Sequence, residues 1–160
     1  MLDGAVNGVV GFYDHCVDLQ TKGKYVESVV QFSQAPGEVV MVSTKHPEIK
    51  SMADLKGKTV GVTGLGSSTN FLTLALAERA KVPVGAFITL PVGAGTTFIA
   101  AMQQDKIQAG MTTEPTISRL LKTGEATVLV DMRTVEKTRA ALGGTYPAAS
   151  FYMDSAWVNS

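Results

Sequence analysis

Apolar and polar residues alternate regularly through the middle of the chain. From Lys58 onward, short apolar runs are separated by longer segments in which apolar residues recur at helical spacing. The last of these segments carries Pro115 in its first turn, a favourable position for proline. The pattern predicts strands at 58–64, 86–92, 107–113 and 126–132, with helices at 67–80, 95–106 and 114–124. Such alternation with short connections predicts an α/β layer on a largely parallel sheet.

The flanking segments are richer in β-branched and small residues. They predict further strands within 4–12, 25–34, 37–44 and 143–160. A short helix is expected at 14–23, with Asp14 as its N-cap and Gly23 as its end. In the polar connector that follows, Ser51 can cap a single helical turn ending at Gly57. These segments lie on either side of one complete α/β unit, so we expect them to belong to a second unit.

Composition and charge narrow the function classes. The chain has 160 residues, 45% of them hydrophobic, which is ordinary for a globular protein. Lys and Arg balance Asp and Glu at 14 each, and no basic stripe points to nucleic acid. Cys16 is the only cysteine, so neither an intrachain disulfide nor a cysteine metal cluster is expected. No apolar run reaches the ~18 residues of a membrane span, and the first residues lack a signal-peptide pattern.

The loop between the strand at 58–64 and the next helix is rich in glycine and hydroxyl residues. Gly64 and Gly66 allow a tight turn, and Ser67, Ser68 and Thr69 follow at the start of the helix. The Walker and dinucleotide-binding motifs are both absent. A helix start of this kind favours a negative group, although the same residues also make an ordinary turn.

Two further loops repeat this arrangement after later strands. In a parallel sheet such loops lie together along the edge where α/β proteins bind ligands. The three loops therefore predict a small-molecule site, with Glu114 able to accept hydrogen bonds from a ligand or to favour its helix start. The residues of the second and third loops are Gly93, Gly95, Thr96, Thr97, Thr113 and Glu114.

No catalytic arrangement emerges from the sequence. Asp14, His15 and Cys16 are consecutive, but neighbours in sequence point to different faces and rarely act together. Cys16 is best interpreted as an inert buried thiol, and His46 as a solvated surface residue. Two distant histidines give no metal-ligand spacing. We therefore expect no enzyme, no catalytic residue, no metal and no cofactor.

Several motifs together resemble the solute-binding proteins of bacterial ABC importers, in the NMT1/THI5-like group that includes nitrate, sulfonate and taurine binders. The motifs are "GFYDH", "IKSMADLKGKTVGVTGLGSSTNF", "VGAGTTFIAAMQQDKIQAGMTTEP" and "GGTYPAA". The resemblance implies an α/β, type II periplasmic-binding-protein fold, of which this chain holds one complete lobe and fragments of the other. On that template, residues 1–43 are part of the first lobe and a hinge strand, 44–145 are the second lobe, and 146–160 are the hinge return and the start of a first-lobe segment.

The resemblance also implies a function. The protein would bind a sulfonate, nitrate, carboxylate or pyrimidine-like solute in the cleft between the lobes, in the periplasm, and deliver it to an ABC permease; the signal peptide is not in this chain. The second-lobe wall would include Gly66, Ser67, Ser68, Thr69, Gly93, Gly95, Thr96, Thr97, Thr113 and Glu114, faced by Tyr13, Asp14 and His15 of the first lobe.

Two further expectations concern an alternative function and the assembly of the protein. The same fold serves as the effector domain of LysR-type transcriptional regulators, which is the main alternative function. First-lobe strands left exposed could pair through their edges, so a homodimer or a domain swap is also expected.

Overall fold

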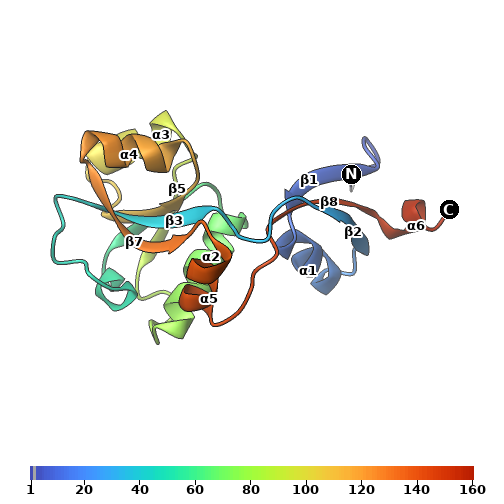
Figure 1. Ribbon diagram of the computed structural model, residues 1–160, viewed down its shortest axis with the longest axis horizontal. Helices are drawn as coiled ribbons and strands as arrows, with labels where there is room; N and C mark the ends of the chain where they lie inside the picture. Colours follow the sequence, from blue (N-terminus) through green and yellow to red (C-terminus); the bar gives the residue numbers. More distant parts are fainter. Residues whose placement is uncertain (2) are drawn as a thin grey trace.

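The chain folds into two units joined by two connections, in a computed structural model that describes residue 1 and residues 3–160 (Figure 1). The large unit holds a sheet of five strands in the order β5-β4-β6-β3-β7, and the small unit holds a sheet of three in the order β1-β8-β2. The connections are residues 32–37, between β2 and β3, and residues 143–148, between α5 and β8.

The sheet of the large unit is mixed, whereas the sequence predicts a largely parallel one. Its strands are β3 (Glu38–Ser43), β4 (Thr59–Val62), β5 (Ile88–Pro91), β6 (Ala109–Thr112) and β7 (Ala126–Met132). β4 pairs parallel with β5 and β6, whereas β3 runs antiparallel between β6 and β7. Four strands therefore point the same way, and β3 is the exception.

Helices cover both faces of this sheet. α3 (Thr96–Gln103) and α4 (Thr116–Thr123) lie on one face, and α2 (Ser68–Arg79) and α5 (Val135–Leu142) lie on the other (Figure 1). The 3₁₀ helix η1 (Met52–Leu55) packs with α2. Because a strand's side chains alternate between faces, Val39 and Met41 of β3 pack with Phe98, whereas Val40 packs with Leu72. All six residues of β3 are buried, as a strand covered on both faces requires.

The small unit covers its sheet on one side. Its elements are β1 (Gly8–Phe12), α1 (Asp14–Thr21), β2 (Val26–Gln31), β8 (Ala149–Asp154) and the short α6 (Ser155–Val158). Both β1 and β2 pair antiparallel with β8. α1 packs on one face, where Cys16, Val26 and Tyr152 form a small core.

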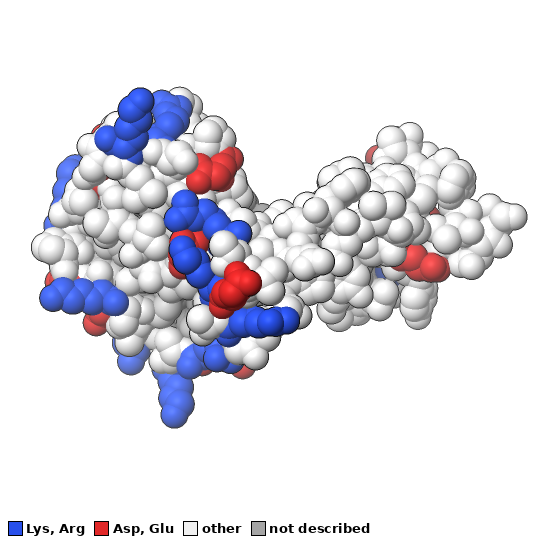
Figure 2. Space-filling view, viewed as in Figure 1, with Lys and Arg blue, Asp and Glu red and all other residues white. Residues whose placement is uncertain are grey.

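The opposite face of the small sheet is open. Val10 and Val30 both pair with Phe151, and the three make an apolar row across the strands. Val10 is 66% exposed and Val30 48% exposed. Basic residues are few in the small unit: Lys22 and Lys24 are its only Lys or Arg residues, and in Figure 2 the blue side chains gather over the large unit.

Most expected elements are present, with four differences. The five-stranded sheet begins at Glu38, before the boundary expected at 43/44, because β3 pairs with β6 and β7. The helices α5 and α6 were not anticipated. Asp14 as an N-cap is wrong: Tyr13 is the N-cap of α1, its backbone already being in the helical region. α4 begins at Thr116, with Pro115 as its N-cap.

Other expectations about helices hold. Ser51 is the N-cap of η1, and its backbone N–H and its hydroxyl donate to the Asp54 carboxylate at 2.9 and 2.8 Å. Within the described residues, no helix is both long enough and apolar enough to cross a membrane.

Candidate functional site

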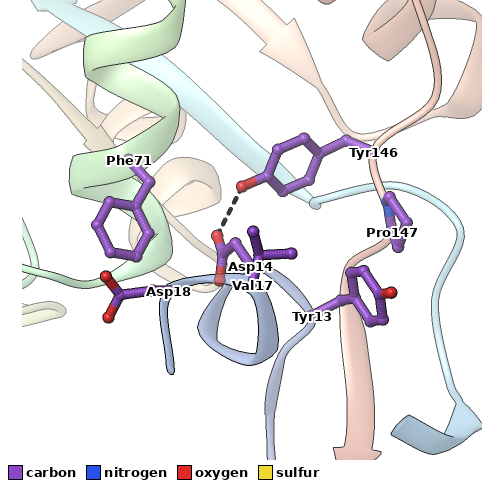
Figure 3. A pocket seen from close by; sticks show the side chains of 7 residues that line it. All are labelled: Tyr13, Asp14, Val17, Asp18, Phe71, Tyr146 and Pro147. Carbon is purple, nitrogen blue, oxygen red and sulfur yellow. Dashed lines mark hydrogen bonds between the residues drawn. The ribbon is translucent and has the colours of Figure 1, made fainter. Parts of the chain in front are cut away.

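A cavity of about 410 Å³ lies where the two units meet. α1 of the small unit, α2 of the large unit and the connection at residues 146–147 form its walls (Figure 3). A small pocket with mainly apolar walls and a few polar groups is the usual form of a small-molecule site. Its lining residues are Tyr13, Asp14, Val17, Asp18, Phe71, Tyr146 and Pro147.

Aromatic rings form much of the wall. Phe71 and Tyr146 approach from different segments with Asp14 between them, and Tyr13 stands beside Pro147 (Figure 3). The His15 ring does not line the cavity but packs edge-on against Phe71, with ring centroids 6.3 Å apart. The walls therefore suit a planar or apolar ligand body.

Asp14 and Tyr146 link the small unit to the connection. The Tyr146 hydroxyl donates to Asp14 Oδ2 at 2.7 Å. The other oxygen, Asp14 Oδ1, is buried without a hydrogen-bond partner within the described residues; His15 Nε2 lies 3.8 Å from it. Burial, the hydrogen bond to Asp14 and the charges of Asp14 and Glu38 raise the pKa of Tyr146 far above its usual range, so the phenol stays a donor.

A second carboxyl group is buried nearby, at the start of β3. Glu38 is 0% exposed, and its Oε1 accepts a hydrogen bond from Ser68 Oγ at 2.6 Å. Its Oε2 has no partner among the described residues. Burial raises the pKa of Glu38 to about 7, the bond from Ser68 opposes that rise, and the charge of Asp14 adds to it. Glu38 thus changes protonation near neutral pH.

The Gly-Ser loop before α2 is closed by its own hydrogen bonds. Ser67 caps α2, its Oγ accepting from the Asn70 N–H at 3.3 Å. Thr69 Oγ1 accepts from the Thr63 N–H, and Asn70 Oδ1 accepts from the Gly66 N–H, both at 3.0 Å. The side chains of Thr63, Ser67 and Thr69 also bond one another. The hydroxyl and amide groups expected to hold an anion are therefore largely engaged within the loop.

The second expected loop lies outside this cavity. Gly93 and Gly95 have positive φ angles of 73° and 65°, which a tight turn into α3 requires. The Gly95 N–H donates to Thr116 Oγ1 at 2.9 Å, and Thr97 Oγ1 donates to the Ala94 carbonyl at 3.0 Å. Thr96, on the first turn of α3, is exposed.

The third loop is likewise outside the cavity. Thr113 is half-buried, and Glu114 is exposed. Glu114 Oε2 accepts from the Ser118 N–H at 3.0 Å, and its Oε1 lies 3.7 Å from Arg133 Nη1. Glu114 thus stabilises the start of α4 and pairs with a cation that the sequence pattern did not bring to this edge.

Two of the expected site residues, Tyr13 and Asp14, therefore line the cavity. Ser68 does not line it, but its hydroxyl donates a hydrogen bond to the buried Glu38. Sequence reasoning missed Phe71, Tyr146 and Glu38. Tyr146 stands in the quoted "GGTYPAA" motif, which was a usable signal. Phe71 has the spacing of a core residue in a helix, and nothing in the sequence around Glu38 marks it as buried.

The other titratable residues are arranged mainly for stability. Within the described part of the chain, no group of three or more His, Cys, Asp or Glu residues could hold a metal ion. Cys16 is buried, and burial raises the pKa of its thiol, as expected of an unreactive cysteine. His46 lies at the surface, as expected, but its ring is half-buried and paired, with ring nitrogens 2.7 Å from Asp105 Oδ1 and 3.1 Å from Glu48 Oε1.

The chain is similar to known proteins in sequence and in fold. The family model described as NMT1/THI5 like matches residues 3–140. A solved structure from Bordetella bronchiseptica RB50 is 33% identical with a TM-score of 0.91, covering 99% of this chain and 50% of that one. The periplasmic aliphatic sulphonate binding protein SsuA from Escherichia coli is 23% identical with a TM-score of 0.74, covering 98% of this chain and 50% of that one. The α/β periplasmic-binding-protein fold is thereby confirmed.

The matches are partial in length. The chain spans about half the length of these solved structures. Among curated proteins, a homoserine kinase from Gluconacetobacter diazotrophicus is 26% identical over 95 residues, which is 55% of this chain and 29% of the kinase. That segment is too small a part of the kinase to carry its activity over to this chain.

Proposed function

This chain belongs to the NMT1/THI5-like family, and on that premise we propose that it binds a small solute in the cavity between its two units, in the periplasm, for delivery to an ABC importer. One observation carries the proposal. The cavity has walls from both units and from a connection between them, so a solute bound there contacts all three. A hinge movement of the units would open and close such a site.

The chemical groups in the cavity walls indicate which of the expected solute classes fits best. Of the four expected classes, sulfonate, nitrate and carboxylate are anions, and each would meet the carboxyl groups of Asp14 and Asp18 in the cavity wall. A pyrimidine-like ring instead suits the space between Phe71 and Tyr146 and can bring N–H donors. We therefore place the ring-shaped class ahead of the three anions.

Solute binding can be tested with a matched pair of tyrosine variants. We would screen the 160-residue chain by thermal shift against alkanesulfonates, nitrate, carboxylates and aminopyrimidines. A solute at ~100 times its dissociation constant should stabilise the fold by ~2.7 kcal/mol. Tyr13→Ala, in the cavity wall, should abolish that shift, whereas Tyr25→Ala, an exposed tyrosine outside the cavity, should leave it unchanged.

Two results would contradict the proposal. Equal shifts in Tyr13→Ala and Tyr25→Ala would place the site elsewhere, and no shift with any compound would argue against solute binding by this chain. The alternative of a LysR-type effector domain has no comparable support, since the family match favours the importer branch.

Self-association is a second proposal, about assembly. We propose that the open face of the small sheet, with its row Val10, Phe151 and Val30, pairs with a second copy when nothing else covers it. Light scattering after size exclusion should show a dimer fraction that rises with concentration. Val10→Lys should abolish that fraction; a monomer at every concentration would contradict the proposal.

A further inference from the structure

The N-terminus of α2, where an anionic ligand was expected, is already occupied by a carboxyl group of the chain itself. Glu38 Oε1 accepts from the hydroxyl of Ser68, the first residue of α2. A helix N-terminus attracts negative charge, and Glu38 supplies it from within the large unit. The adjoining Gly66 N–H is taken by Asn70 Oδ1. An incoming anion would therefore find neither the charge nor the donors that this position normally offers.

Two carboxyl groups, one in the cavity wall and one buried near it, each have one oxygen hydrogen-bonded and one without a partner among the described residues. Asp14 lines the cavity and is 11% exposed; its Oδ2 is held by Tyr146, and its Oδ1 is unpartnered in the described chain. Glu38 is fully buried, with Oε1 held by Ser68 and Oε2 unpartnered there. Both carry charge close enough to Tyr146 to raise its pKa. Buried acceptors without donors are costly, and a bound donor would relieve that cost.

Neither of these carboxyl groups is neutralised by a lysine or arginine among the described residues. Among the residues described, neither Asp14 nor Glu38 forms an ion pair with Lys or Arg, and the only basic group near Asp14 Oδ1 is His15, at 3.8 Å. No lining residue of the cavity is basic. Asp18, the other acidic lining residue, is paired with Lys22 at 2.7 Å, so that lysine is already engaged. The cavity thus has a surplus of negative charge.

The aromatic walls complement this charge. Phe71 and Tyr146 stand on either side of Asp14, and Tyr13 completes the wall (Figure 3). The faces of aromatic rings attract cations, most strongly where water is excluded. Carboxylates together with aromatic faces and no basic side chain are the combination that recognises an organic cation.

Resting on the function proposed above, we propose that the solute is an organic cation with a protonated nitrogen, an amine, amidine or guanidine, on an apolar or aromatic body. The nitrogen donates to Asp14 Oδ1 and lies in the field of Glu38, while the body packs between Phe71 and Tyr146. This assigns to the cavity the opposite charge preference from the sulphonate named for the Escherichia coli structure.

The test compares probes that share a ring and differ in charge. Isothermal titration of the 160-residue chain at pH 8 would use benzylamine, benzamidine and phenylguanidine as cations, benzyl alcohol as the neutral analogue and benzenesulfonate as the anion. The tightest cation should bind at least about tenfold more tightly than benzyl alcohol, and benzenesulfonate should not bind.

Charge-neutral variants test the two carboxylates. Asp14→Asn and Glu38→Gln should each weaken cation binding by about tenfold. Glu78→Gln, an exposed position on α2, is the matched control and should bind as the unmodified chain does. Both cavity variants conserve shape, and a thermal melt confirms that each is folded. A cation beside Glu38 favours its ionised form, so binding at pH 7 should release protons, measured by titration in two buffers of different ionisation enthalpy.

The groups around Glu38 are Ser68 from α2, Asp14 from α1 and Tyr146 from the connection. Of the titratable neighbours, Tyr146 has a pKa raised far above this window. Proton release that is present in the unmodified chain and absent in Glu38→Gln therefore reports Glu38. Cation binding in Asp14→Asn and Glu38→Gln as tight as in the unmodified chain would overturn the proposal.

Failure of this inference can be separated from failure of the proposed function. If benzenesulfonate binds, the cations do not, and Tyr13→Ala removes the binding, the cavity is a solute site but the charge preference is wrong. If neither these probes nor the solutes screened above bind, the proposed function fails together with the inference.

Discussion

The large and small units bury their sheets in different ways. In the large unit, two apolar clusters lie on opposite faces of the five-stranded sheet, and residues as large as Phe98 and Met41 are fully buried. In the small unit one face packs on α1, while Val10 and Val30 on the other face are exposed. A sheet with both faces covered can be stable by itself, whereas a three-stranded sheet with one open face depends on what covers it.

Because of this difference, the stability of the large unit and the binding of a solute depend on different parts of the molecule. The large unit has its own core, so we expect its fold to be stable without the small unit. The cavity needs both, since Tyr13 and Asp14 come from the small unit and Phe71 from the large one. A change in the small unit can therefore impair binding while most of the protein stays folded.

The largest expected effect is on the core of the large unit. Phe98→Ala leaves a cavity beside Gly110, against which the ring is tightly packed, and should cost ~3–5 kcal/mol of unfolding free energy. Phe32→Ala, at an exposed phenylalanine of the first connection, should stay within ~0.5 kcal/mol. Urea unfolding followed by far-UV circular dichroism measures both.

The single tryptophan allows the unfolding of the small unit to be followed separately. Trp157 lies in α6 of the small unit, so its fluorescence follows that unit while circular dichroism is dominated by the helices of the large one. The Trp157 transition should come at lower urea than the dichroism transition. Coincident transitions would show that the two units fold as one. Equal costs for Phe98→Ala and Phe32→Ala would instead contradict the role given to the buried core.

The next effect concerns Glu38, which belongs to the large unit but lies at the junction. Its folded pKa, about 7, is raised from the value of 4.5 expected in the unfolded chain. The folded state therefore holds the proton more tightly, and stability falls as pH rises from 4.5 to 7. Glu38→Gln removes that penalty and should be more stable than the unmodified chain by roughly 3 kcal/mol at pH 8, and equal to it at pH 4.

Urea unfolding at the two pH values measures this effect, with Glu78→Gln as the control that should show no difference. A Glu38→Gln variant that is less stable at pH 8 would mean that the charge of Glu38 is compensated within the chain. The ionised Glu38 would then not lower the unfolding free energy of the large unit.

The smallest expected effect lies on the surface of the large unit. The hydrogen bond to Asp105 and the nearby Glu48 raise the pKa of His46 above 6.5, so its contribution is present below pH 6.5 and is lost as pH rises through the folded value. Because both partners are half-exposed, His46→Ala should cost less than ~1 kcal/mol at pH 5.5 and less still at pH 8.5.

Nuclear magnetic resonance titration of the His46 ring gives its pKa directly, and urea unfolding gives the cost. A cost of several kcal/mol would contradict the assignment of the large unit's stability to its core.

Local sequence patterns were enough to predict most strands and helices of the large unit. The apolar spacing from Lys58 onward predicts its β4 to β7 strands and their intervening helices, since each element's periodicity is complete within the element. The helix α5 was missed although its signals are present: Thr134 caps it through the Lys137 N–H, and Gly143 ends it with a positive φ of 79°.

The site could be predicted only in part. Tyr13 and Asp14 were expected to line it, and they do line the cavity. The burial of Glu38 depends on the packing of β3 between strands far along the chain, which no local pattern reveals. The hydroxyls of Ser67 and Thr69 looked available to a ligand, but their mutual bonds are set by the three-dimensional path of the loop. Residue types indicate which chemistry is possible, and tertiary contacts decide which groups remain free.

The order of strands in the small sheet also constrains how the chain folds during synthesis. β8 is the central strand of that sheet, yet in this sequence it follows the whole large unit, and among the described residues both β1 and β2 pair with β8. The whole large unit, residues 38–142, leaves the ribosome before β8 does. Since domains fold as they emerge, the large unit folds first, while β1 and β2 wait unpaired. A chaperone that shields newly made strands would therefore act on β1 and β2 rather than on the larger core.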